Sequence, residues 1–275
     1  MHYHQIEIIT SNEEIQEILI SQLSEEGYDG FEQFDNKLIA IIKEDDFNEV
    51  LLKEIIEPFN VSFIKKIIPQ QNWNTVWESN FQPVIVENFV GIRAHFHSTI
   101  QNVQHEIIIT PKMSFGTGHH ATTYMMMQLM QTIDFNNKSV FDFGTGTGIL
   151  AILAEKLKAN SVLAVDYDDW CIENALENIS NNNCKNISIE KKNTAEVNDV
   201  FDIVIANINK NIIQDNFEDL HLTSKKGSTI LLSGLLVEDE NDIIQLSQQK
   251  NWVHQKTINK NGWIAMQFLK DNLSE

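Results

Sequence analysis

The sequence is poor in basic residues. It contains 20 Lys/Arg against 39 Asp/Glu, which gives a formal net charge of −19 at pH 7. Proteins that bind nucleic acid usually carry a basic patch or stripe, and no stretch of this chain is basic. We therefore expect no direct contact with nucleic acid. The acidic balance suits a cytosolic enzyme in general, or an enzyme whose partner is basic.

Cysteine is scarce, and Cys171 and Cys184 are the only two. Two thiols in 275 residues do not make a disulfide framework, and neither lies in the paired Cys/His spacing of a zinc site. The adjacent His119 and His120 point apart in most backbones and have no acidic or cysteine partner at ligand spacing. We expect reduced cysteines and no metal.

Long apolar runs are absent as well. No run reaches the roughly 18 residues that suggest a membrane-spanning helix. The start, MHYHQIEIIT, lacks the basic region and apolar core of a signal peptide. Hydrophobic residues make up an ordinary 42% of the chain, whose length suffices for one large or two modest domains. The expected location is the cytoplasm, with no membrane contact.

Proline is rare, and all four prolines precede residue 112. Residues 1–67 show the order βαββαβ, which predicts a small α+β domain of the ferredoxin-like type. A hairpin is expected at Asp35-Asn36, and the second helix is expected to begin with its acids and to stop at Pro58. The expected strands are 2–9, 31–34, 38–42 and 61–68, and the expected helices are 11–27 and 45–58.

Residues 68–81 predict a linker helix between two prolines. Trp73, Trp77 and Phe81 recur at i, i+4 and i+8, so they share one helix face. The simplest interpretation is a packing stripe that docks the linker.

Residues 82–275 predict a larger α/β domain. Three strands come first, and from residue 122 helices and strands alternate, as in a parallel sheet covered by helices. A final hairpin around Asn261-Gly262 is expected to close the sheet with antiparallel strands. The expected strands are 84–90, 92–96, 106–110, 139–143, 161–166, 187–190, 202–206 and 228–233, and the expected helices are 124–133, 149–158, 169–180 and 210–221.

Three alternating glycines, Gly144, Gly146 and Gly148, stand between a strand and a helix. The dinucleotide fingerprint is G-x-G-x-x-G, and its third glycine position is Ile149 here. Asp142, two residues before the glycines, would repel a pyrophosphate from the lip of the site but suits a sulfonium. Asp166 follows the next strand at the distance from which an acid can accept ribose hydroxyls. The pattern favours S-adenosylmethionine over NAD; a ligand-free glycine turn is a further alternative.

Asn207 ends the strand in FDIVIANIN, where ligands meet a doubly wound sheet. Its amide offers donors and an acceptor without charge, so it is our candidate catalytic residue for orienting a reacting amine. The alternative is a cap on the next helix, and the two roles are compatible.

FGTGHHATT, followed closely by DFGTGTGILAI, AVDYD and ANIN, resembles the PrmA family, the methyltransferases of ribosomal protein L11. The first loop departs from the family pattern at His119, usually Thr, and at Ala121, usually Pro. The likeness extends to NWNTVWESNFQP in the linker and to LLSGLL near residue 231. The first loop matches at Phe115, Gly116, Thr117, Gly118, His120, Thr122 and Thr123.

The resemblance implies a class I, Rossmann-like methyltransferase domain behind the ferredoxin-like domain. It implies that Thr123, Gly144, Asp166 and Asn207 contact S-adenosylmethionine, and we add Gly146 of the same loop as a cofactor-binding residue. The two glycine loops would then form two walls of one pocket.

The activity that the resemblance implies is methyl transfer to lysine side-chain amines of ribosomal protein L11, with the N-terminal amine as a second candidate acceptor. The ferredoxin-like domain, residues 1–67, would select that substrate. The alternatives are a methyltransferase of the same fold acting on another protein or a small molecule, and a non-catalytic module that binds S-adenosylmethionine.

Overall fold

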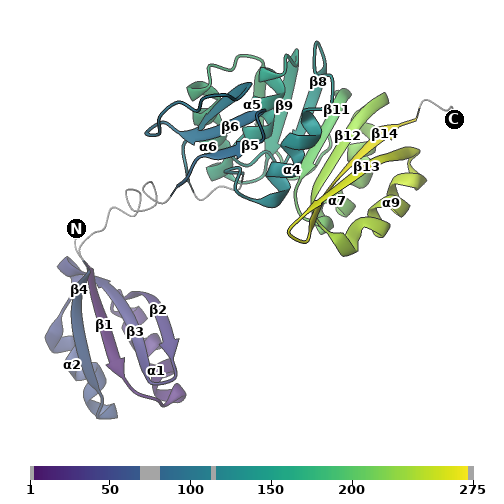
Figure 1. Cartoon of the computed structure of the whole chain (residues 1–275). Coiled ribbons are helices and arrows are strands. Elements are labelled where there is room, and N and C mark those ends of the chain that lie inside the picture. The colour runs from purple at the N-terminus through teal and green to yellow at the C-terminus, as the bar shows by residue number, and fades with distance from the viewer. Residues whose placement is uncertain (1–2, 69–80, 113–115, 272–275) are drawn as a thin grey trace. The chain divides into compact units, whose positions relative to one another are not determined.

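The computed structural model describes residues 3–68, 81–112 and 116–271. The chain divides into two compact units, Met1–Asn80 and Phe81–Glu275 (Figure 1). Each has its own buried core. The predicted linker helix, with Trp73 and Trp77, lies outside the described residues apart from its ends.

The front unit is a four-stranded antiparallel sheet with two helices, in the predicted order βαββαβ. Its strand order is β2-β3-β1-β4, and Phe34 pairs with Lys37 across the predicted Asp35-Asn36 turn. Ile6 and Ile8 of the central strand are fully buried with Leu19 and Leu52 of the helices. The elements are β1 (Tyr3–Ile9), α1 (Glu13–Glu25), β2 (Asp29–Phe34), β3 (Lys37–Lys43), α2 (Glu49–Ile56) and β4 (Ser62–Ile68).

The predicted start of the second helix is wrong. Glu44–Asp46 form a separate 3-10 turn, and Phe47 returns the backbone to an extended conformation while its side chain packs on the core. α2 begins only at Glu49, because the Asn48 side chain accepts hydrogen bonds from the N–H groups of Val50 and Leu51. An asparagine that satisfies free helix N–H groups defines the start better than acidic charge alone.

The large unit is built on a seven-stranded sheet in the order β10-β9-β8-β11-β12-β14-β13 (Figure 1). The first five strands are parallel, and the last two form the predicted antiparallel hairpin, with Lys260 paired to Trp263. Asn261 and Gly262 both have positive φ, as a two-residue hairpin turn requires. The strands are β8 (Ser139–Phe143), β9 (Ser161–Asp166), β10 (Ile187–Lys191), β11 (Phe201–Asn207), β12 (Ser224–Leu236), β13 (Trp252–Lys260) and β14 (Trp263–Lys270).

Helices cover both faces of this sheet. On β11, Ile203 and Ile205 belong to a core shared with α4 and α5, whereas Val204 and Ala206 belong to a core shared with α7, α8 and α9. Successive strand residues point to opposite faces, so this alternation shows a sheet buried on both sides. The helices are α4 (Ala121–Met130), α5 (Ile149–Lys156), α6 (Asp169–Asn181), α7 (Lys210–Asp215), α8 (Phe217–Leu222) and α9 (Glu240–Gln249).

Several expected element boundaries are wrong. The expected helix 210–221 is broken at Asn216, whose side chain accepts from the Ala195 N–H and donates to the Ile212 carbonyl. Helix α9 was not predicted, and β12 is much longer than residues 228–233. The expected strand 84–90 ends at Val86, because Glu87 adopts a positive φ in a turn.

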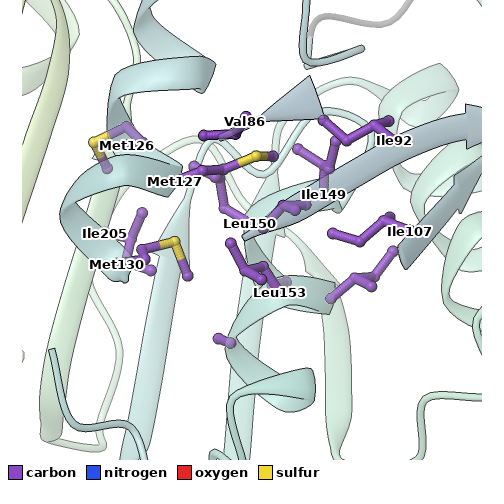
Figure 2. Close-up of a cluster of buried hydrophobic side chains, with 14 of the residues drawn as sticks. Val86, Ile92, Ile107, Met126, Met127, Met130, Ile149, Leu150, Leu153 and Ile205 are labelled. Atoms are coloured by element: carbon purple, nitrogen blue, oxygen red, sulfur yellow. The ribbon is translucent and has the colours of Figure 1, made fainter. Parts of the chain in front are cut away.

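A second, three-stranded sheet carries the chain toward the first glycine loop. It consists of β5 (Val84–Val86), β6 (Val90–Ala94) and β7 (His105–Ile109). Met125, Met126 and Met127 of α4 are all buried, so they are core residues. Figure 2 shows α4 methionines amid side chains from this sheet, from α5 and from β11: Val86, Ile92, Ile107, Ile149, Leu150, Leu153 and Ile205. This core fixes α4, and with it Thr123, against the main sheet.

Candidate cofactor site

The predicted site residues gather at one edge of the main sheet. β8, β9 and β11 are neighbouring parallel strands, and they end at Phe143, Asp166 and Asn207. Phe143 pairs with Val165 on one side and with Ala206 on the other. The carboxyl ends of parallel strands share one edge, where doubly wound sheets bind their ligands.

The second glycine loop (residues 144–148) has positive φ at Gly144, Gly146 and Gly148, which strongly favours glycine at all three positions. Its backbone donors are largely used within the protein. The N–H groups of Gly144 and Thr145 donate to the Val165 carbonyl, and that of Gly148 donates to the Thr145 carbonyl. A pyrophosphate site needs such N–H groups free, so this arrangement argues against a dinucleotide.

Asp166 takes up a further donor of the loop. Its Oδ2 accepts from Gly146 N at 2.9 Å, and its Oδ1 accepts from Asp168 N at 3.1 Å. The side chain is 7% exposed. A carboxylate has about four lone-pair positions, so each oxygen retains capacity for a ribose hydroxyl. The geometry is compatible with the predicted cofactor role.

The glycines also make room for the protein's own side chains. A Cβ at Gly144 would lie 2.2 Å from Ile208 Cγ2, and one at Gly148 would lie 3.2 Å from Ala175 Cβ. Glycine in such a loop also allows the close approach of a ligand to the backbone. Packing already explains the glycines at these two positions, so a cofactor contact of Gly144 stays a prediction about its backbone.

Asp142 does not stand at the lip of the site, and this expectation was wrong. Its side chain is only 1% exposed, and Oδ2 accepts from Thr145 Oγ1 at 2.6 Å. Burial raises the pKa of Asp142 to about 7, and the nearby charge of Asp166 adds to this rise. Asp142 therefore supports the loop from within.

Asn207 carries a buried hydrogen-bond acceptor that the described part of the protein leaves unused. Its Nδ2 donates to Thr123 Oγ1 at 3.3 Å, which brings two predicted residues together from β11 and α4. The Oδ1 atom is buried and has no hydrogen-bond partner among the described residues. A buried acceptor left unpaired costs about 1–3 kcal/mol, so a ligand donor fits here. The cap of α7 is Asn209, so the alternative cap role of Asn207 was wrong.

His119 and His120 have packing and capping contacts. His120 caps α4, with Nδ1 accepting from Thr122 N, and its ring packs edge-on against Trp263. The ring of His119 packs edge-on against Phe81 at 4.8 Å. Across residues 3–68, 81–112 and 116–271, no three His, Cys, Asp or Glu side chains come together as a metal site requires.

Sequence reasoning missed the role of Ile208, the residue that follows Asn207. Ile208 packs closely against β12: its N–H donates to the Ser233 carbonyl, and a Cβ at Gly234 would lie 2.1 Å from the Ile208 carbonyl oxygen. Gly234 sits at a register shift between β12 and β14. The signal was an isolated glycine within the apolar strand LLSGLL, which often marks a bulge or a close backbone approach.

Comparison with known proteins assigns this arrangement to a family. The family model described as ribosomal protein L11 methyltransferase (PrmA) matches residues 3–271. The chain belongs to this family. The predicted resemblance, the class I methyltransferase fold and S-adenosylmethionine as the cofactor are thereby confirmed.

Individual relatives agree with this assignment. A protein of Porphyromonas gingivalis named ribosomal protein L11 methyltransferase is 37% identical over 264 residues, which cover 93% of this chain and 91% of the relative. A protein of the same name from Phocaeicola vulgatus is 35% identical, with 94% and 95% covered. The crystal structure of a ribosomal protein L11 methylase from Lactobacillus delbrueckii subsp. bulgaricus superposes with a TM-score of 0.65 at 27% identity, covering 70% of this chain and all of that one.

In the part of the chain that the structure describes, no helix combines the length and the apolar character needed to cross a bilayer.

Replacing Asp166 by Ala should weaken the binding of S-adenosylmethionine. Each lost charge-assisted hydrogen bond to ribose is worth about 1.5–3 kcal/mol. Isothermal titration calorimetry measures the change, with Asp169→Ala as the control, because Asp169 is an exposed neighbour that pairs only with Lys191 in the ion pairs of the described residues. Unchanged affinity in a folded Asp166→Ala variant would refute the ribose assignment.

The pH dependence of stability should change in Asp142→Asn. The pKa of Asp142 is raised from 3.8 to about 7 on folding, so the native state favours the protonated acid. The stability that protonated Asp142 contributes is therefore fully present below about pH 4 and is lost as the pH rises toward 7. Relative to Asp142→Asn, the wild-type free energy of unfolding should drop by an amount on the order of 4 kcal/mol, at about 1.36 kcal/mol per pKa unit. Urea titrations across this pH range test it, with exposed Asp199→Asn as the control; a pH-independent difference would contradict the assignment.

Proposed function

We propose that this protein transfers methyl groups from S-adenosylmethionine to lysine side-chain amines of ribosomal protein L11. The N-terminal amine is a second candidate acceptor with the same chemistry. The observation that supports this best is the buried, unpaired Oδ1 of Asn207 at the carboxyl edge of the sheet. Family membership supports the choice of substrate, since the relatives carry that name.

Asn207 is placed to orient an amine. Its side chain is 7% exposed and is held by Thr123 through Nδ2, which directs Oδ1 away from that bond. Oδ1 accepts one N–H of the incoming amine, and this contact fixes the direction of the nitrogen lone pair. Alignment of this kind can contribute up to about 7–11 kcal/mol to catalysis.

The acceptor amine must be neutral to attack. Lysine has a reference pKa of about 10.4, and burial disfavours its charged form. S-adenosylmethionine, when bound, supplies an electrophilic methyl group on a positively charged sulfur. The proton leaves to water before the amine is seated, so no side chain of this chain is assigned as a general base.

The test is mass spectrometry of purified ribosomal protein L11 after incubation with the enzyme and S-adenosylmethionine, with wild type expected to add methyl groups to lysine. Asn207→Ala should lower turnover on the order of 10²-fold, because misplaced reactants lose rate steeply, and should affect cofactor affinity less.

Asn209→Ala is the matched control for Asn207→Ala. Asn209 caps α7 by accepting from Ile212 N, so its loss should lower stability by about 1 kcal/mol and leave turnover near wild type. If wild type leaves L11 unmodified but methylates another protein or a small molecule, the proposed substrate is wrong. If it binds the cofactor and methylates nothing, the non-catalytic alternative holds.

We also propose that the front unit, residues 1–67 with the linker 68–81, recruits the substrate to the catalytic domain, residues 82–275. Residues 1–65 contain 15 Asp/Glu and 4 Lys/Arg, a net charge of −11, which is more than half of the total. Ribosomal proteins are basic as a class, and opposite charge speeds association. The front unit also has an open depression of about 640 Å³ between α2 and β4, lined by apolar side chains such as Val50 and Phe63 and by the charged side chains of Lys53, Glu54 and Glu57.

Charge steering predicts a salt-dependent association rate. Association with L11 should slow strongly between 0.1 M and 1 M salt, as the screening length falls from about 10 Å to about 3 Å. Reversing three exposed front-unit acids, in Glu14→Lys/Glu17→Lys/Glu54→Lys, should mimic added salt while cofactor affinity stays constant. The matched control reverses three exposed acids of the large unit, Glu196, Asp199 and Glu238. Equal effects of the two triple variants, or a rate flat across salt, would leave the front-unit acidity without a recruiting role.

A further inference from the structure

The two glycine loops are joined by one side chain, that of Thr147. Thr147 lies between Gly146 and Gly148 and is fully buried. Its hydroxyl donates to the carbonyl oxygen of Gly116 in the first loop, at 2.6 Å and across 31 residues of sequence. Thr147 is not among the site residues that the sequence or the family resemblance predicted.

The first loop is shaped to receive this hydroxyl. Gly116 has a φ of +104°, and a Cβ built there would lie 2.8 Å from Thr147 Oγ1. A side chain at position 116 would therefore collide with the hydroxyl that binds its own carbonyl. The glycine at 116 and the hydroxyl at 147 form a matched pair, one in each loop.

The backbone of Thr147 is held from the other side by Asn178 of α6. The Asn178 Nδ2 donates to the Thr147 carbonyl at 2.9 Å, and its Oδ1 accepts from Thr110 N at 2.7 Å. Thr110 directly follows β7, the strand that precedes the first loop. Asn178 is fully buried, so the bridge has little freedom. The second loop is thus tied to the preceding segment at Thr110 and to the first loop at Gly116.

Thr147 is linked to the predicted cofactor-binding residues through both loops. The neighbouring Gly146 donates its N–H to Asp166 Oδ2, and the first loop leads through the His120 cap into α4, which carries Thr123. A shift at residue 147 therefore reaches both the Asp166 contact and the residue that holds Asn207. One hydroxyl governs how two parts of the site are spaced.

We infer that Thr147 is a positioning residue, whose hydroxyl holds the first glycine loop (residues 116–120) against the second and sets the spacing of the cofactor site. The inference rests on the cofactor site described above. Without the hydroxyl, the Gly116 carbonyl loses its donor and regains one only from water, which requires the loop to move outward. S-adenosylmethionine then dissociates faster from a site whose chemical groups are all present.

The test compares Thr147→Ser with Thr147→Ala, because these two variants differ by the hydroxyl alone. Thr147→Ala should raise the Kd for S-adenosylmethionine about tenfold, mostly through faster dissociation, which is the effect of about one lost buried hydrogen bond. Thr147→Ser keeps the hydroxyl, so its Kd for S-adenosylmethionine should stay within about twofold of the wild-type value. Calorimetry and stopped-flow displacement measure both quantities without ribosomal protein L11, so failure of the proposed substrate leaves this test intact.

Thr223 provides the matched control pair. It is also buried, and its hydroxyl donates to the Leu220 carbonyl. Thr223→Ala should lower the free energy of unfolding about as much as Thr147→Ala but leave cofactor dissociation unchanged. Equal Kd values for Thr147→Ser and Thr147→Ala, or equal effects of the residue 147 and residue 223 pairs on cofactor affinity, would overturn the inference.

A double-mutant cycle with Gly116→Ala tests the contact from the other loop. In wild type the new Cβ meets the Thr147 hydroxyl, whereas in Thr147→Ala the nearest remaining atom, the backbone nitrogen of residue 147, is 3.6 Å away. The backbone strain that Gly116→Ala introduces through its positive φ is the same in both backgrounds. The loss of cofactor affinity caused by Gly116→Ala should therefore be several-fold smaller in the Thr147→Ala background, since contacting residues do not act additively. Additive effects would overturn the inference.

Discussion

The close packing of Ile208 against two glycines determines the geometry of the whole site. Its side chain occupies the space where Gly144 lacks a Cβ, and its carbonyl occupies the space where Gly234 lacks one. The N–H of Ile208 is bound to the Ser233 carbonyl, and Ser233 Oγ donates in turn to the Ile264 carbonyl. The glycine loop, the turn that carries Asn207 and the final hairpin are thereby fixed to one residue. A side chain at Gly144 would displace the Ile208 side chain, and one at Gly234 would displace the backbone that directly follows Asn207.

Two acidic side chains, Asp142 and Asp166, accept hydrogen bonds from the second loop. Asp166 binds the N–H groups of Gly146 and Asp168, and Asp142 binds the hydroxyl of Thr145. In a dinucleotide fold, N–H groups at this position would face a pyrophosphate. Here the Asp166 carboxylate accepts from the Gly146 N–H, and the Val165 carbonyl accepts from the N–H groups of Gly144 and Thr145. Selection against phosphate is therefore built into the backbone hydrogen bonds, and it does not depend on a charge at the mouth of the site.

Sequence patterns located most of this edge but not its packing. The strand–glycine–helix order and the Asp and Asn that end two strands are local signals, and Asp166 and Asn207 lie as expected at the carboxyl ends of β9 and β11, on either side of β8. Burial is not local. Nothing in the sequence around Asp142 indicates that its side chain is buried and bound by Thr145 and by the backbone of Ala151 in α5, so its exposed position was predicted wrongly. The contacts of Thr147, Asn178 and Ile208 join segments up to 68 residues apart, and no periodicity in one segment reports on them.

Element boundaries failed for a related reason. The breaks at Phe47 and Asn216 come from a ring that packs on the front core and from an amide that binds Ala195 N. Both are tertiary contacts that override helix propensity, which is only a weak prior. The correct predictions, such as the turn at Asn261-Gly262, depend on residues that are adjacent in sequence.

The two departures of the first loop from the family pattern have different structural meanings. Ala121 is the first residue of α4, a position where proline is favoured because its φ is already helical and its missing N–H needs no partner. Alanine there keeps the helix but gives the unfolded chain more freedom, a loss of about 0.4–1 kcal/mol. His119 acts in the opposite direction, since its ring packs edge-on against the buried Phe81, and such ring contacts are worth about 0.5–1.5 kcal/mol. The two magnitudes are similar, so the ring contact of His119 can offset the rigidity lost at Ala121. The hydrogen bond from Thr147 then determines where the loop lies.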